Sequence, residues 1–286
     1  MVVQGRRGRG AAAVAVAVAC GAVLAAGALA TGCSSDGTAV DGLPSAGSAV
    51  EDVRRTADAL LRAGGARIRS TMETVSGGTR VAIRGTGGYD FRAARGQLEL
   101  VLPDPAGERG GSRPPVTEIL APGVLYMKNR GAGVPADKWV RVDAASLADG
   151  NLVTGGATDP LTAAELLRGA GQVRYRGAQR LDGVAVRHYS GTTDIGAAAG
   201  AASARTKPAL TAAEKGFTTR RVPFDAYLDE AGRLRKVRQS YHFANGSPKG
   251  ASVTSTTQLD DFGRDTAVEL PARDDIYAGK IAATGP

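Results

Sequence analysis

The sequence predicts an α+β fold whose main part is one strongly curved antiparallel sheet of about eleven strands. After residue 65 most segments alternate apolar and polar residues with a period of two, which is typical of strands with one buried and one wet face. Helical patterns lie at the front and in the middle of the chain and do not follow every strand. This order argues against a parallel, doubly wound sheet.

The first predicted element is a helix that begins at Ser48, a suitable N-cap, and ends at Gly64-Gly65. Its apolar residues keep helical spacing: Val50, Val53, Ala57, Leu60 and Leu61. Strands are then expected at 67–73, 80–84, 97–102, 124–128 and 138–142, with a Gly/Pro turn at 131–135 before the last of these.

A second helix is predicted from Asp159-Pro160, an acidic cap followed by proline at the first position, to Gly169. Strands at 172–179 and 184–190 follow, joined by Leu181-Asp182-Gly183, the best short hairpin signal in the chain. The Ala-rich segment 195–210 is expected to be helical in part, with a further short helix at 211–215. Three closing strands are expected at 222–228, 234–243 and 252–259, with turns at 229–232 and 245–248.

The front of the chain carries the marks of an export signal. Three arginines at 6, 7 and 9 precede an uncharged, Ala-rich run that ends in small residues before Cys33. This segment resembles a bacterial lipoprotein signal, in which the Cys thiol receives a diacylglycerol and the chain is cut just before it. The resemblance implies a signal peptide at 1–32, lipidation at Cys33, a flexible tether at 33–48, a folded domain at 49–278 and a loose tail at 279–286. The domain would then be anchored on the extracytoplasmic face of the cell membrane.

Two alternatives remain for this segment. An uncleaved membrane anchor is one, because the apolar run is near the length that spans a bilayer. Lipidation at Cys20 is the other, since Ala17-Val18-Ala19-Cys20 also has lipobox shape. Cleavage there would leave an apolar segment at the mature N-terminus, whereas Cys33 opens onto a polar tether.

Net charge and cysteine content give two further expectations for the part of the chain that follows the predicted signal peptide. Removing the three arginines of the signal from a net charge of +8 leaves about +5, which suits anionic lipid head groups or cell-wall polymers. Both cysteines lie in the front segment, so no disulfide is expected in the domain.

The sequence contains no metal-binding, nucleotide-binding or catalytic-nucleophile motif. His188 shares strand parity with Val184 and Val186 and is expected to face the buried side; His242 is expected to be structural as well. The acidic pairs at 260–261 and 274–275 are interpreted as turn or surface charges. The basic runs at 174–176 and 233–238 suit a solvated outer sheet face better than a nucleic-acid surface. We therefore expect a protein that is not an enzyme, with no cofactor or metal and no nucleic-acid partner.

The order of these patterns resembles the actinobacterial lipoproteins of the LppX/LprG type, within the LolA-like group. The resemblance is carried by the lipobox, the amphipathic helix and three segments: Leu125-Tyr126-Met127 turning into Lys138-Trp139-Val140-Arg141-Val142-Asp143, the hairpin Leu181-Asp182-Gly183-Val184-Ala185-Val186-Arg187-His188-Tyr189, and Val222-Pro223-Phe224-Asp225-Ala226-Tyr227-Leu228-Asp229. It implies an unclosed β-barrel with helices packed on the concave side and, in some members, an apolar cavity for acyl chains.

Strand parity then predicts the residues that would line such a cavity: Ile68, Met72, Val81, Ile83, Leu98, Leu100, Val184, Val186, Val222, Phe224 and Leu228. Two interpretations follow. The first is a membrane-anchored lipoprotein that binds or shuttles a lipid or glycolipid by its acyl chains. The alternative is a sensor or interaction lipoprotein that binds an envelope protein and carries no lipid. The pattern is equally consistent with helices that fill the space as an ordinary packed core.

Overall fold

The computed structural model describes residues 46–103, 114–131, 133–243 and 250–279. The chain divides into two units, Met1–Gly42 and Leu43–Pro286, and all described residues belong to the second. The predicted signal peptide, Cys33, the tether up to residue 45, the turn at 245–248 and the tail from residue 280 lie outside the described residues. Within the described ranges, no helix has the length and hydropathy needed to cross a membrane.

The predicted fold class is confirmed. Eleven antiparallel strands form one sheet in the order β6-β5-β4-β3-β2-β1-β11-β10-β9-β8-β7, so β6 and β7 are its two edges and the sheet does not close into a barrel. The strands are β1 Gly65–Ser76, β2 Thr79–Asp90, β3 Arg95–Val101, β4 Val116–Ala121, β5 Val124–Lys128, β6 Trp139–Asp143, β7 Ala170–Leu181, β8 Val184–Asp194, β9 Arg221–Leu228, β10 Leu234–Phe243 and β11 Ala251–Asp260.

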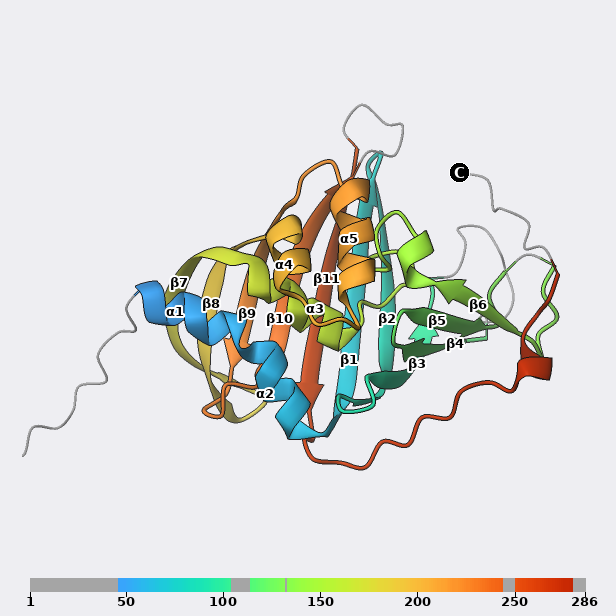
Figure 1. Ribbon diagram of the computed structural model, residues 1–286, viewed down its shortest axis with the longest axis horizontal. Coiled ribbons are helices and arrows are strands. Elements are labelled where there is room, and N and C mark those ends of the chain that lie inside the picture. The colour runs from blue at the N-terminus through green and yellow to red at the C-terminus, as the bar shows by residue number, and fades with distance from the viewer. Residues whose placement is uncertain (1–45, 104–113, 132, 244–249, 280–286) are drawn as a thin grey trace, which may run out of the picture. The chain divides into compact units, whose positions relative to one another are not determined.

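The helices gather on one face of the sheet (Figure 1). They are α1 Ala46–Arg54, α2 Thr56–Ala63, α3 Pro160–Leu166, α4 Ile195–Ala201 and α5 Lys207–Gly216, with short 3₁₀ turns η1 Ala144–Ser146, η2 Leu167–Gly169 and η3 Arg273–Asp275. The predicted first helix is in fact two helices, broken at Arg55. The Thr56 hydroxyl donates to the Val53 carbonyl (2.9 Å), a local bond that bends helices.

The predicted helix cap at Asp159 and the predicted hairpin turn at Asp182-Gly183 are both present in the structure. The Asp159 carboxylate accepts from the Thr162 amide (2.7 Å) and caps α3, with Pro160 at the first position. Asp182 and Gly183 both have positive φ, 49° and 81°, as a two-residue hairpin turn requires. Strand β4 was not marked by alternation, because its inward positions include Glu118 and its outward Ile119 is buried.

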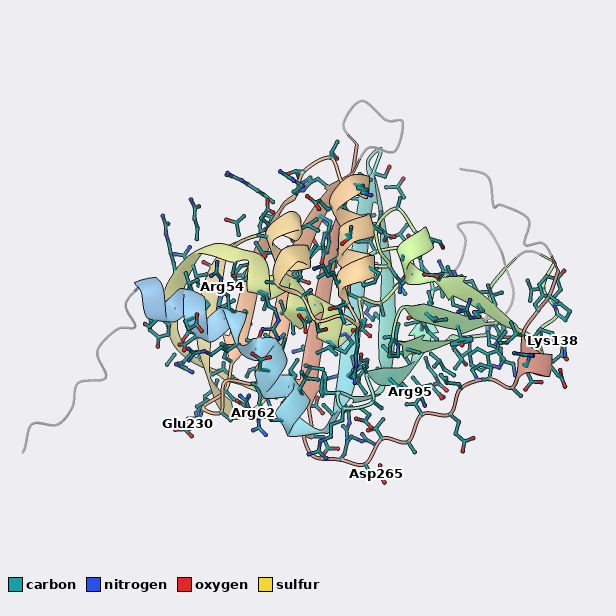
Figure 2. The ribbon with its side chains drawn as sticks, in the orientation of Figure 1. Arg54, Arg62, Arg95, Lys138, Glu230 and Asp265 are labelled. Atoms are coloured by element: carbon teal, nitrogen blue, oxygen red, sulfur yellow. The ribbon has the colours of Figure 1, made fainter. Side chains whose placement is uncertain are left out.

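The edge at β6 is covered by the end of the chain. The segment after β11 runs back along the sheet to β6 (Figure 1), where Ile276 forms a parallel bridge with Trp139. The Tyr277 amide donates to the Trp139 carbonyl (2.8 Å), and Lys138, which lies beside η3 (Figure 2), donates to the Asp274 carbonyl (3.0 Å). This pairing satisfies part of an exposed sheet edge.

Candidate functional site

The candidate site is the interface between the concave sheet face and the helices. Strand register places nine of the eleven predicted lining residues on this face, since Ile68 lies opposite Gly87, and Gly87 opposite Leu98. Seven of them are buried and two are not: Val81, near the start of β2, is 40% exposed, and Ile83 is half-buried. The buried set is Ile68, Met72, Leu98, Leu100, Val222, Phe224 and Leu228.

The other two predicted residues, Val184 and Val186, lie on the opposite, outer face. On β8 it is Tyr189 that pairs with the buried Ala226, whereas His188 pairs with the half-buried Tyr227. Val184 and Val186 share the parity of His188, so they point away from the helices. This differs from the expectation that all eleven share one face, because alternation identifies which residues of a strand lie together but not which face they take.

The helices pack closely on the concave face. One apolar cluster joins Val53 and Leu60 of the first two helices to Ile68, Leu98 and Leu100 of the sheet, all at most 1% exposed. A second cluster joins α4 and α5 to β9 and β10; its members include Ile195, Ala198, Leu210, Ala213, Val222 and Tyr241. Helices α4 and α5 bury mostly alanine.

A small pocket of about 40 Å³ opens at the seam between the sheet, α3 and α5. Its walls include Tyr89, Leu120, Asp159, Leu161 and Ala209. The Tyr89 hydroxyl donates to the Asp159 carboxylate (2.8 Å), and desolvation raises the pKa of both groups. The pocket has room for no more than a few water molecules, because one water needs about 10–15 Å³ of such volume.

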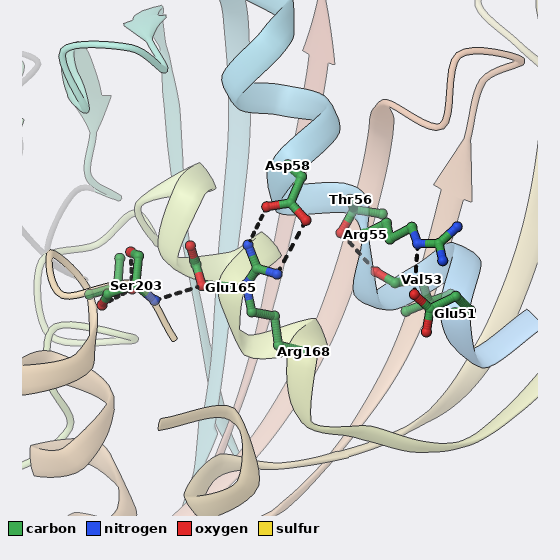
Figure 3. A network of polar contacts seen from close by, with 9 residues as sticks. Glu51, Val53, Arg55, Thr56, Asp58, Glu165, Arg168 and Ser203 are labelled. Atoms are coloured by element: carbon green, nitrogen blue, oxygen red, sulfur yellow. Dashed lines mark hydrogen bonds and ion pairs between the residues drawn. The ribbon is translucent and has the colours of Figure 1, made fainter. Parts of the chain in front are cut away.

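Polar contacts join the helices to one another. The Arg168 guanidinium bonds Asp58 of α2 (2.6 and 3.3 Å) and Glu165 of α3 (2.7 Å), as Figure 3 shows. Glu165 also accepts from the Ser203 amide, just after α4 (3.3 Å). These partners raise the pKa of Arg168, which therefore stays charged, and they connect α2, α3 and the end of α4 into one layer.

A second set of polar contacts holds this layer to the sheet. Gln239 of β10 donates its amide to the Ala163 carbonyl (3.0 Å), and the hydroxyls of Thr158 and Ser255 are 2.7 Å apart. The Thr193 hydroxyl donates to the Leu166 carbonyl (2.6 Å). The concave face is therefore aliphatic at its two sides and polar beneath α3.

Glu118 is a buried acid that the sequence did not single out. It points inward from β4 and is 0% exposed, and neither carboxylate oxygen has a hydrogen-bond partner among the described residues. Desolvation raises its pKa to about 8, although the charge of Arg130 opposes the shift. The signal that could have found it is Glu118 at an inward parity position between Val116 and Leu120.

The histidines occupy hydrogen-bonded or exposed positions. His188 bonds Asp225 through Nε2 and Gln179 through Nδ1, both at 2.9 Å, and its ring stacks on Tyr227. His242 is exposed. No cluster of three or more potential metal ligands occurs among the described residues.

An open, curved antiparallel sheet with helices covering its concave face is the architecture that the LolA-like resemblance implies. Among solved structures, the chain is similar to the lipoprotein LppX of Mycobacterium tuberculosis, with 11% sequence identity, a TM-score of 0.48, and coverage of 79% of this chain and 100% of that one. It is also similar to LprF from Mycobacterium bovis (15% identity, TM-score 0.42, coverage 81% and 100%). A third is a DUF1329 family protein from Desulfovibrio piger (12% identity, TM-score 0.29, coverage 76% and 95%). No protein-family model and no curated protein sequence matches the chain.

Proposed function

We propose that this protein is a membrane-anchored, non-enzymatic lipoprotein that binds the acyl chains of a lipid or glycolipid between the concave sheet face and its helical layer. The observation that supports this proposal is the composition of the helical layer. It consists of separate short helices over an aliphatic face, and its α4 and α5 bury mainly alanine, with a small pocket at the seam.

Entry of an acyl chain requires the helices to move outward, because the pocket of about 40 Å³ is too small for one. The composition of α4 and α5 limits the cost of this movement, because four of their six buried residues are alanine and two, Ile195 and Leu210, are large. Exposing an alanine methyl costs less than exposing a leucine side chain, which is worth about 1.5–3 kcal/mol when fully buried. The predicted anchor at Cys33 would keep the domain within reach of membrane lipids.

A disulfide that fixes the start of α3 to the sheet tests this proposal, because Arg168 and Glu165 connect α3 to α2 and to the end of α4. Thr158→Cys with Ser255→Cys replaces two hydroxyls that are 2.7 Å apart beneath the start of α3, within reach of a disulfide. Ser240→Cys with Thr254→Cys is the matched control, since it joins β10 to β11 on the outer face, where the hydroxyls are 3.4 Å apart. Neither pair competes with a native cysteine of the predicted mature chain.

We expect the oxidised Thr158/Ser255 variant to lose uptake of a fluorescent fatty acid and to regain it on reduction, while the control pair takes up the probe in both states. Native-membrane preparations of the unmodified protein should yield bound lipid by solvent extraction and mass spectrometry. No uptake by the unmodified protein, or full uptake by the oxidised variant, would contradict the proposal.

The alternative is an interaction lipoprotein with no lipid cargo, and the close packing of the concave face favours it. It predicts an envelope protein that co-purifies equally well with the oxidised and the reduced Thr158/Ser255 variant. Membrane attachment is tested separately, because Cys33→Ser should abolish acylation and change the mass of the mature protein.

A further inference from the structure

A broad groove of about 740 Å³ lies on the outer face of β7–β10, on the opposite side of the sheet from the helices. Three arginines line it: Arg174 and Arg176 from β7 and Arg238 from β10. All three are exposed. The groove is separate from the acyl-binding site proposed above and takes no part in it.

The course of strand β7 determines where Arg174 and Arg176 lie. Arg174 and Arg176 both lie on the outer face because they are two residues apart on the strand, and a bulge between Tyr175 and Gly177 leaves Arg176 without a pairing partner on β8. Gly177 has a φ of 112°, which a residue with a Cβ rarely adopts. The Arg176 Nε then donates to the Ser190 hydroxyl (2.6 Å), which fixes the guanidinium over the groove.

The groove has an excess of positive charge. Among the described residues that line the groove, Asp225 is the one carboxylate; it lies opposite Arg238 in the strand register but accepts from His188 (2.9 Å). None of the three guanidinium groups forms an ion pair with a described residue. A concave surface with three unpaired guanidinium groups attracts anions, and the planar fork of arginine matches the oxygens of a phosphate.

The volume of the groove and its place in the fold indicate which kind of ligand it can bind. The volume lies within the usual range of about 300–1,000 Å³ for small-molecule sites, which exceeds what a lone ion needs. Hydroxyl groups of Thr192 and Ser240 in the lining can also donate to phosphate oxygens. The groove adjoins the end of the sheet at which the folded domain begins, since Arg54 of α1 donates to the Ala170 carbonyl of β7 (2.9 Å).

We propose that this groove binds a phosphate-bearing polar group, either the head group of an anionic lipid or a small phosphorylated molecule. Arg174 and Arg238 approach the phosphate from opposite walls, and Arg176 is held beside them by Ser190.

Titration calorimetry of the purified full chain with soluble probes tests this proposal. The probes are dihexanoyl phosphatidylglycerol below its micelle concentration, inorganic phosphate and dihexanoyl phosphatidylcholine. The groove variant is Arg174→Gln with Arg238→Gln. The control, Arg62→Gln with Arg84→Gln, removes the same charge from exposed positions outside the groove; Arg62 lies on α2 (Figure 2).

We expect the groove variant to bind phosphatidylglycerol about tenfold more weakly and the control less than about twofold more weakly. Stronger binding of phosphatidylglycerol than of phosphate identifies a lipid head group, whereas equal or stronger binding of phosphate identifies a free phosphorylated ligand. Absence of binding to all phosphate probes, or equal losses in the two variants, would overturn the proposal. The oxidised Thr158/Ser255 variant should keep this binding, which separates the groove from the acyl site.

Discussion

The Arg69 guanidinium, on the central strand β1, is 2.6 Å from the Asp182 carboxylate at the tip of the β7–β8 hairpin. Strands β11, β10 and β9 separate β1 from β8 in the sheet. The contact is made on the outer face, since Arg69 is exposed while its neighbours Ile68 and Ser70 are buried. The hairpin therefore bends toward the outer face, and the groove lies on this side of the sheet.

Arg69→Ala should loosen the hairpin tip with little effect on global stability. Arg69 also pairs with Asp260 (2.9 Å), whose side chain is 21% exposed, but the Arg69 and Asp182 side chains are about half exposed, so the loss should be about 1 kcal/mol. Hydrogen exchange should accelerate at residues 181–184. Arg80→Ala, which removes a longer exposed pair to Glu73 (3.8 Å), is the control and should leave the tip unchanged.

Arg168→Met should destabilise the helical layer by about 3 kcal/mol, measured by urea unfolding. The change leaves Glu165, which is 0% exposed, without its cation. Arg55→Met is the matched control, because its pair with Glu51 is exposed and should be worth less than about 1 kcal/mol. Adding Glu165→Gln to Arg168→Met should restore part of the loss; equal effects of the two single changes would refute this role.

Glu118→Gln should change how stability depends on pH. The Glu118 carboxyl has a pKa of about 8 in the folded protein against an ordinary value of 4.5, so between these values the folded state holds the extra proton. The free energy of unfolding should therefore fall as pH rises, by up to about 1.4 kcal/mol per unit, and level off above the folded pKa.

The Glu118→Gln variant lacks this loss, so its stability relative to the unmodified protein should improve steadily from pH 5 to pH 8 in denaturant titrations. Glu99→Gln, on the exposed face of neighbouring β3, is the control and should show no such trend. A constant difference across this range would mean that Glu118 is ionised in the folded state.

Asp159→Ala should cost about 2 kcal/mol, because Asp159 both caps α3 and accepts from the buried Tyr89 hydroxyl. Asp159→Asn keeps one oxygen, which can accept from the Thr162 amide, and places an NH₂ group where the Tyr89 hydroxyl can accept from it, so it should lose less than half as much in thermal or urea unfolding. Equal losses would indicate that the charge of Asp159, and not its hydrogen bonds, is what stabilises this end of α3.

Local structure was predictable where a few adjacent residues decide it. Asp159-Pro160 begins a helix and Asp182-Gly183 makes a hairpin turn because capping and positive φ depend on the residues themselves. Alternation likewise identified most strands, since the pleat fixes a period of two. It missed β4, where Glu118 faces inward and Ile119 faces outward.

The sequence by itself determined the α+β class, the antiparallel strands, their main turns and the aliphatic character of the concave face. Tertiary structure alone decided which face Val184 and Val186 occupy, that Glu118 is buried with no hydrogen-bond partner in the described part of the chain, and that Arg238 shares a groove with Arg174 and Arg176. The physical reason is that pairing partners, bulges and sheet curvature depend on contacts between distant segments. No local pattern of residues encodes those contacts.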